Sequence, residues 1–130
     1  MTLPRRLSLT CPLSRCFSLP AYRGAKVTFL ASSLDAVAGV HPSFLDASSL
    51  DNTTVPIALF PSADEDKTIM AALEKAISAK PVADKCAVHT FEASPHGFAM
   101  ARADLKKEAD RKVFHEAYER LGKFFVGAGF

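Results

Sequence analysis

The chain has 130 residues, which is enough for one domain at most. An apolar fraction of 48%, a charged fraction of 23% and a formal net charge of +2 are typical of a soluble globular protein, and they give no reason to expect a nucleic-acid or membrane partner. No apolar run approaches the roughly 18 residues of a membrane span. The three cysteines, Cys11, Cys16 and Cys86, lack disulfide-framework spacing, which favours a reducing compartment. We therefore expect a cytoplasmic protein.

Residues 1–22 differ in composition from the rest of the chain. They are rich in Leu, Ser, Pro and Arg, and no acidic residue precedes Asp35. One interpretation is a mitochondrial transit segment, although Pro4, Pro12 and Pro20 would interrupt its amphipathic helix. The other is a translated intron end, because the codons for these residues are largely pyrimidines. We expect residues 1–22 to be disordered and residues 23–130 to form the domain.

From Gly24 onward, hydrophobic periodicity and turn residues predict regular elements. In chain order these are a short helix over 25–32, strands over 36–40 and 55–60, a helix over 65–79, a strand over 85–91 and a helix over 105–126. The polar stretch 48–54 is predicted to be a surface loop. In the strand over 85–91, alternation places Cys86, Val88 and Thr90 on one face, and Ala87, His89 and Phe91 on the other.

Two residues with acid–base chemistry follow neighbouring predicted strands. Asp64 lies just after the strand over 55–60, and His96, in Ser94-Pro95-His96-Gly97-Phe98, lies just after the strand over 85–91. Strand, helix and strand form one βαβ unit, whose strands run parallel. Asp64 and His96 should therefore meet at the carboxyl edge of the sheet, where α/β proteins bind ligands. An acid followed by a histidine is the order found in α/β-hydrolase triads.

Each of these assignments has an alternative. Asp64 can instead cap the following helix, and a slip of one residue would transfer the acid role to Glu65 or Asp66. The other histidines have structural explanations: His41 as a turn residue near the site, His89 on a sheet face and His115 on a helix surface. No His, Cys or acidic pair has zinc spacing, so no metal is expected.

Several segments resemble the C-terminal part of the dienelactone hydrolase family. They are His41-Pro42-Ser43-Phe44, the stretch from Pro56 to Glu65, His96-Gly97-Phe98-Ala99, and the helix that ends Leu121-Gly122-Lys123-Phe124-Phe125. In this order they cover about two thirds of the chain. The resemblance implies an ester or lactone hydrolase with a cysteine nucleophile and no metal or organic cofactor. It also implies Asp64 and His96 as catalytic residues, and it makes Arg102 either a substrate-carboxylate anchor or a solvated side chain.

The family's nucleophile is missing from this sequence. The family signature resembles Gly-x-Cys-x-Gly-(Gly/Ala)-Lys, and its end matches Gly24-Ala25-Lys26, which places Tyr22 at the cysteine position. The remaining alternatives for a nucleophile are Cys16, Ser32, Ser33 and Ser43. We therefore expect the C-terminal fragment of such an enzyme, inactive by itself.

These observations predict an α/β fold of about three parallel strands flanked by helices: an incomplete α/β-hydrolase sheet without its N-terminal strands and nucleophile elbow. The strand over 36–40 would then be an open edge, and the chain would be marginally stable and self-associate there. The expected ligand is a small ester or lactone. The rival interpretation is a non-catalytic pseudoenzyme that binds a small acid or a partner protein.

Overall fold

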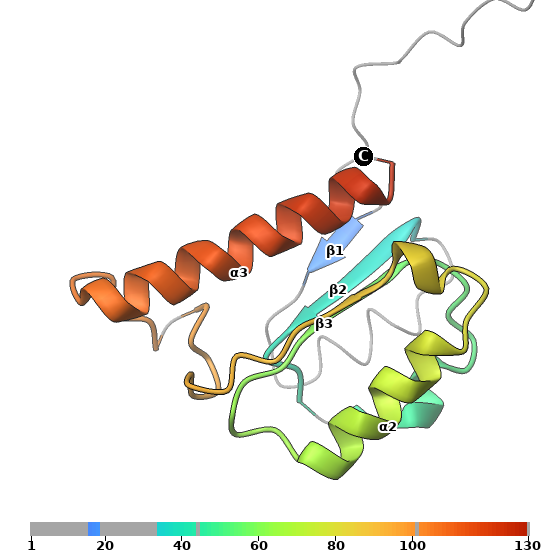
Figure 1. Ribbon diagram of the computed structural model, residues 1–130, viewed down its shortest axis with the longest axis horizontal. Helices are drawn as coiled ribbons and strands as arrows, with labels where there is room; N and C mark the ends of the chain where they lie inside the picture. Colours follow the sequence, from blue (N-terminus) through green and yellow to red (C-terminus); the bar gives the residue numbers. More distant parts are fainter. Residues whose placement is uncertain (1–15, 19–33, 44, 101, 130) are drawn as a thin grey trace, which may run out of the picture.

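The computed structural model describes residues 16–18, 34–43, 45–100 and 102–129. Within these ranges it contains one parallel sheet with the strand order β1-β2-β3-β4 (Figure 1). The strands are β1 (Cys16–Ser18), β2 (Ala36–Val40), β3 (Ile57–Phe60) and β4 (Ala87–Val88). Helix α2 (Lys67–Ser78) connects β3 to β4, and helix α3 (Glu108–Gly127) follows β4. The protein is therefore an α/β protein, as predicted.

Helices cover both faces of the sheet (Figure 1). All residues of β2 and β3 are buried, which explains why these strands read as continuous apolar runs. One face of the sheet packs against Ala117, Leu121 and Phe124 of α3. The other packs against Leu73 and Ile77 of α2. The sheet is thus the middle layer of three, and its strand ends are left open for a site.

The predicted alternation along β4 is confirmed. Ala87 and Phe91 belong to the core cluster under α3, whereas Cys86 and Val88 pack with the cluster under α2. His89 lies on the α3 side, where its Nε2 is 3.7 Å from Oε1 of Glu116. Regular pairing is shorter than the predicted strand and spans two residues, with one further bridge between Ser62 and Phe91.

Helix α2 begins two residues later than predicted because Asp66 is its N-cap. The Asp66 side chain accepts hydrogen bonds from the backbone N–H groups of Thr68 (2.8 Å) and Ile69 (3.0 Å). These are two of the amides that the first turn of a helix leaves without an intrahelical partner. Asp64 therefore does not cap this helix, and its carboxylate is available for another contact.

The polar stretch 48–54 is more ordered than a simple surface loop. It begins inside the 3-10 helix η2 (Ala47–Leu50), which Asp46 and Ser49 close with reciprocal capping hydrogen bonds. After α2, the Lys80 ammonium donates to the carbonyl oxygens of Leu50 and Thr53, both at 2.7 Å. These charged hydrogen bonds attach η2 to the end of α2, and a second 3-10 helix, η3 (Ala83–Lys85), leads into β4.

The expectation that the strand over 36–40 is an open edge is wrong. Strand β1 pairs with it in parallel, with Cys16 opposite Ala36 and Ser18 opposite Ala38. Part of the stretch 1–22, for which we expected disorder, is thus a strand of the sheet. An edge strand has unpaired backbone N–H and C=O groups. Here β1 pairs with these groups of β2 over Ala36–Ala38. Self-association stays a prediction, but it no longer has this edge as its basis.

The predicted helix over 25–32 lies outside the described residues. None of the helices formed by the described residues is long and apolar enough to cross a membrane.

Candidate functional site

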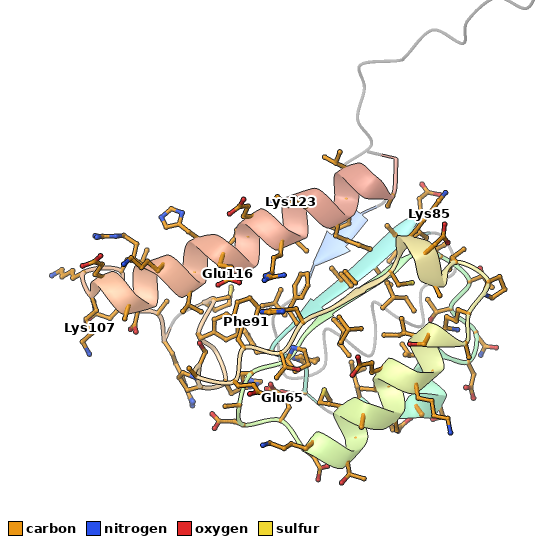
Figure 2. All side chains as sticks on the ribbon, viewed as in Figure 1. Glu65, Lys85, Phe91, Lys107, Glu116 and Lys123 are labelled. Atoms are coloured by element: carbon orange, nitrogen blue, oxygen red, sulfur yellow. The ribbon has the colours of Figure 1, made fainter. Side chains whose placement is uncertain are left out.

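The loops after β2, β3 and β4 meet at the carboxyl edge of the sheet. Two backbone contacts hold the last two together: Ala63 N–H donates to the Ser94 carbonyl at 2.9 Å, and Phe91 N–H donates to the Pro61 carbonyl at 2.8 Å. Figure 2 shows Glu65 and Phe91 at this end of the sheet. As predicted, Asp64 and His96 come together here, because the backbone N–H of His96 donates to Oδ2 of Asp64 at 2.7 Å.

The carboxylate that contacts the His96 ring belongs to Glu65. Its Oε1 lies 2.6 Å from Nδ1 of His96, and its Oε2 accepts a hydrogen bond from the backbone N–H of Ser62. The expectation that Asp64 orients the imidazole is therefore wrong by one residue. The turn after β3 places the Asp64 carboxylate at the backbone N–H of His96 and the Glu65 carboxylate at Nδ1 of its ring.

Burial also favours Glu65 as the partner of the imidazole. The Glu65 side chain is 6% exposed, whereas the His96 side chain is 37% exposed. An ion pair that is shielded on one side is screened less by salt than a surface pair. A carboxylate only accepts hydrogen bonds, so in the neutral imidazole Nδ1 of His96 carries the proton and Nε2 presents a lone pair. The site thus holds a base with a fixed tautomer, open to solvent.

Ser43 lies on the free side of the His96 ring. Its Oγ is 3.3 Å from Nε2 of His96, across a sequence separation of 53 residues. With the tautomer that Glu65 selects, the Ser43 hydroxyl donates to Nε2. Ser43, His96 and Glu65 therefore form a continuous chain of hydrogen bonds over the strand ends.

The buried ring of His41 packs against the ring of His96. It is 6% exposed, and its ring meets that of His96 edge to face, with centroids 4.9 Å apart. It also contacts the ring of Phe98 at 5.8 Å. Among the described residues, Nε2 of His41 has no hydrogen-bond partner. Its φ of 39° lies in the left-handed region, which non-glycine residues seldom adopt.

Burial lowers the pKa of His41, and the neighbouring His96 lowers it further. In the unfolded chain His41 takes up a proton near pH 6.5, whereas in the folded protein it stays neutral to a lower pH. The unfolded state therefore binds more protons between these two values, and stability falls as the pH drops below about 6.5. We expect His41 to contribute a slope of at most about 1.4 kcal/mol per pH unit.

This effect is measured by urea unfolding at pH 7.5, 6.5 and 5.5. We compare the natural chain with His41→Asn, because Asn tolerates left-handed backbone and does not titrate. The free energy of unfolding of the variant should fall less on acidification, and the other histidines should contribute equally to both proteins. Parallel pH profiles would show that His41 is not a buried neutral group.

Arg102 holds the His96 loop. Its Nη1 donates to the carbonyl oxygen of His96 at 3.3 Å, and a Cβ added at Gly97 would lie 3.1 Å from its Cδ. Gly97 has a φ of 84°, a backbone conformation that favours glycine, and a side chain at this position would also displace Arg102 by a few tenths of an ångström. Arg102 thus has a structural contact in addition to any role with a substrate.

Two cavities adjoin the Glu65–His96 pair. The first, which we call the Ser43–His96 cavity, has a volume of about 330 Å³. It is lined by Ser43 and His96 and by apolar side chains, those of Pro42, Leu45, Ile69 and Met70. Asp64, Glu65 and Asp66 line it as well, so the charged side chains among its described lining residues are acidic unless His96 is protonated. A compact uncharged ligand fits this surface better than an anion does.

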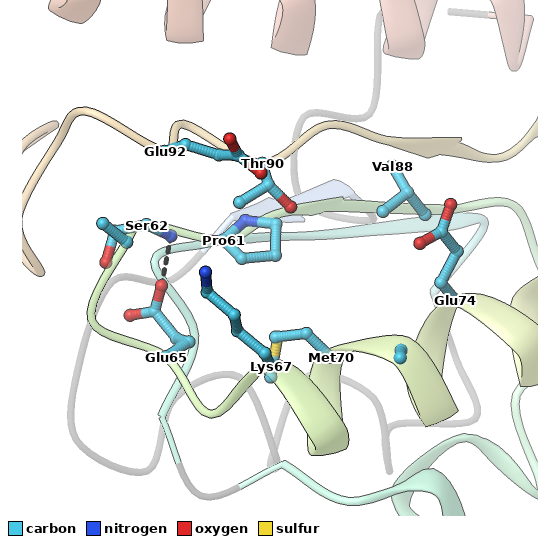
Figure 3. Close-up of a pocket in the computed structure, with 11 residues that line it drawn as sticks. Pro61, Ser62, Glu65, Lys67, Met70, Glu74, Val88, Thr90 and Glu92 are labelled. Atoms are coloured by element: carbon cyan, nitrogen blue, oxygen red, sulfur yellow. Dashed lines mark hydrogen bonds between the residues drawn. The ribbon is translucent and has the colours of Figure 1, made fainter.

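The second, helix-side cavity has about 240 Å³ and lies between α2 and the ends of β3 and β4. Figure 3 shows Lys67 reaching from α2 toward Pro61, with Glu65 beside it and Glu74 farther along the helix. Glu65 and Met70 line both cavities. Within the described residues, no three His, Cys, Asp or Glu side chains are grouped so that they could hold a metal ion.

Comparisons with known proteins reveal relatives without a described activity. No protein-family profile matches the chain, and no solved structure gives a significant match. Among curated proteins, the chain is 37% identical over 105 residues to an uncharacterized AIM2 family protein of Schizosaccharomyces pombe. It is 33% identical over 85 residues to a second uncharacterized AIM2 family protein of the same yeast.

These matches cover 78% and 65% of this chain, but 42% and 34% of the two relatives. The chain therefore spans about two fifths or less of the length of the curated relatives that it matches. Their names state no substrate and no reaction.

Proposed function

We propose that the chain carries the acid and the base of a hydrolase that acts on ester or lactone carbonyls, of the dienelactone hydrolase type. The observation that supports this is the pairing of His96 Nδ1 with the buried Glu65 carboxylate at 2.6 Å. In such a pair the carboxylate fixes the tautomer of the imidazole and stabilises its charged form, while Nε2 takes a proton from the attacking group. Glu65 replaces Asp64 as the proposed acid.

The position of the pair in the fold agrees with this proposal. The acid follows β3 and the histidine follows β4, so both stand at the carboxyl ends of adjacent parallel strands. This is where the acid and the histidine of an α/β-hydrolase are placed, in the same chain order. The position that the resemblance assigns to the nucleophile, Tyr22, lies outside the described residues.

The Ser43–His96 cavity suggests the substrate. Its apolar walls suit a short acyl group, and its acidic residues disfavour a substrate that carries its own carboxylate. We therefore propose a small uncharged ester or lactone as the substrate. The resemblance adds that no metal or organic cofactor takes part, and the cysteine pattern favours the cytoplasm.

The proposal is tested with p-nitrophenyl acetate and a small neutral lactone. The sequence led us to expect an inactive fragment, but Ser43, one of the alternative nucleophiles, has its Oγ 3.3 Å from Nε2 of His96. We therefore expect turnover by the natural chain and its loss in His96→Ala, which removes the proposed base. His115→Ala is the matched control: this histidine is exposed on α3, far along the chain from the site. Thermal unfolding followed by circular dichroism confirms that each variant is folded.

Equal turnover in the His96 and His115 variants would contradict the proposal. Saturable binding of the lactone without any hydrolysis would contradict it too, and would favour the rival interpretation of a non-catalytic binding protein.

A further inference from the structure

We propose that Ser43 is the nucleophile activated by His96, in place of the cysteine that the resemblance to the dienelactone hydrolase family implies. This inference rests on the proposed function, since it names the group that the base deprotonates. The Ser43 hydroxyl is 3.3 Å from Nε2 of His96, and Nδ1 of the same ring is 2.6 Å from Glu65. A hydroxyl, an imidazole and a carboxylate joined in this order are the three parts of a serine-hydrolase triad, which is recognised by geometry and not by sequence position.

A strained turn of the backbone stands two residues before Ser43. Strand β2 ends at Val40, and the next residue, His41, has a φ of 39°. A left-handed backbone conformation is strained in any residue that has a Cβ atom, and a following proline restricts that residue further. Strain of this kind persists where surrounding contacts impose it, and it concentrates at functional sites. Here the buried His41 and Pro42 turn the chain sharply, and Ser43 is presented next to the His96 ring.

The order of the three residues agrees with this assignment. Ser43 follows β2, Glu65 follows β3 and His96 follows β4, so three successive parallel strands deliver one group each to the same edge. Serine, acid and histidine occur in this chain order in α/β-hydrolases. Ser43 also lines a cavity of about 330 Å³ together with His96, so a substrate carbonyl can reach both groups.

The chemistry balances with water as the second reactant. As Oγ of Ser43 bonds to the carbonyl carbon, its proton passes to Nε2 of His96 and the carbonyl π electrons move to the oxygen. When the tetrahedral intermediate collapses, the bond to the leaving oxygen breaks and Nε2 returns the proton to that oxygen, leaving an acyl-serine. Water then attacks the acyl carbon while Nε2 takes its proton, and Ser43 leaves with that proton as the acid is released.

The test uses an alkyl fluorophosphonate, which phosphonylates an activated serine and releases fluoride. Intact-mass measurement on the folded natural chain should show one adduct, which peptide mapping places on Ser43. The adduct should be absent in Ser43→Ala, and it should form at least about a hundredfold more slowly in His96→Ala. Ser78→Ala is the control, because Ser78 is exposed on α2 and donates only to the Glu74 carbonyl at 2.9 Å. This variant should react like the natural chain.

A folded chain without an adduct on Ser43, or one whose labelling ignores His96, would overturn the assignment. Ester turnover gives a second readout that separates the two proposals. Turnover that needs His96 but survives Ser43→Ala would reject Ser43 as the nucleophile and keep the proposed function. Turnover that ignores His96 would reject the proposed function itself. Loss of turnover in both variants, with both folded, would support Ser43.

Discussion

Glu65→Gln is expected to lower the rate of ester hydrolysis by about 10²–10⁴-fold, whereas Asp64→Asn should lower it by less than about tenfold. The two carboxylates are adjacent in sequence, but they contact different parts of His96. The Glu65 carboxylate accepts a hydrogen bond from the ring nitrogen Nδ1, and the Asp64 carboxylate accepts one from the backbone N–H of the same residue. A glutamine amide can present its N–H₂ group to Nδ1, which would favour the wrong tautomer and remove the negative charge that stabilises the imidazolium.

Asp64→Asn is the matched control, since Asn keeps a side-chain oxygen that can accept the backbone N–H of His96. The measurement is kcat/KM for p-nitrophenyl acetate with the two variants, together with their thermal unfolding. A large loss in Asp64→Asn with little loss in Glu65→Gln would return the acid role to Asp64. Equal small losses would show that no carboxylate assists the base.

The sequence predicts best where burial imposes a clear pattern of apolar residues. The strand over 36–40 has the predicted limits, because every residue from Ala36 to Val40 is apolar or glycine and both faces are covered. The two faces of the segment around Ala87 also follow from alternation alone. The meeting of Asp64 and His96 was predictable from topology, since parallel strands bring their carboxyl ends to one edge.

Two features depend on information that patterns of this kind do not carry. The sequence favoured Asp64 as the acid and left Glu65 as an alternative one residue away, and the choice between them depends on the dihedral angles of the turn after β3. Pairing of Cys16–Ser18 with Ala36–Ala38 joins segments with 17 intervening residues, and three residues are too few for a strand signal. The contact of Ser43 with His96 likewise crosses 53 positions, although the turn at His41-Pro42 was a visible signal.

The position of the site and the stability of the core are linked through a cluster of aromatic rings beside the His96 loop, formed by Phe60, Phe91 and Phe98. Phe91 follows β4 and packs against the rings of Phe60, with centroids 6.4 Å apart, and Phe98, at 4.8 Å. Phe98 in turn contacts the ring of His41. The side chains that fill the core beside α3 are therefore continuous with those that support the imidazole.

Phe91→Ala is accordingly expected to reduce the free energy of unfolding by about 3–5 kcal/mol. Phe91 is 6% exposed, and its loss leaves a cavity between the sheet end and the His96 loop. Small domains have only about 5–15 kcal/mol of stability, so a large share would be lost. Urea unfolding measures the change, and hydrolysis by the remaining folded protein should fall as well, because the loop that carries His96 loses its support.

Phe114→Ala separates this effect from a general loss of aromatic surface. Phe114 is half-buried on α3 and stacks mainly on the exposed Tyr118, with centroids 4.7 Å apart, so its removal should cost about 1 kcal/mol. Phe91→Leu should recover more than half of the loss, because leucine refills most of the cavity with apolar atoms. Equal losses in Phe91→Ala and Phe114→Ala would show that the sheet end does not depend on Phe91, and that the His96 loop is held by its backbone hydrogen bonds alone.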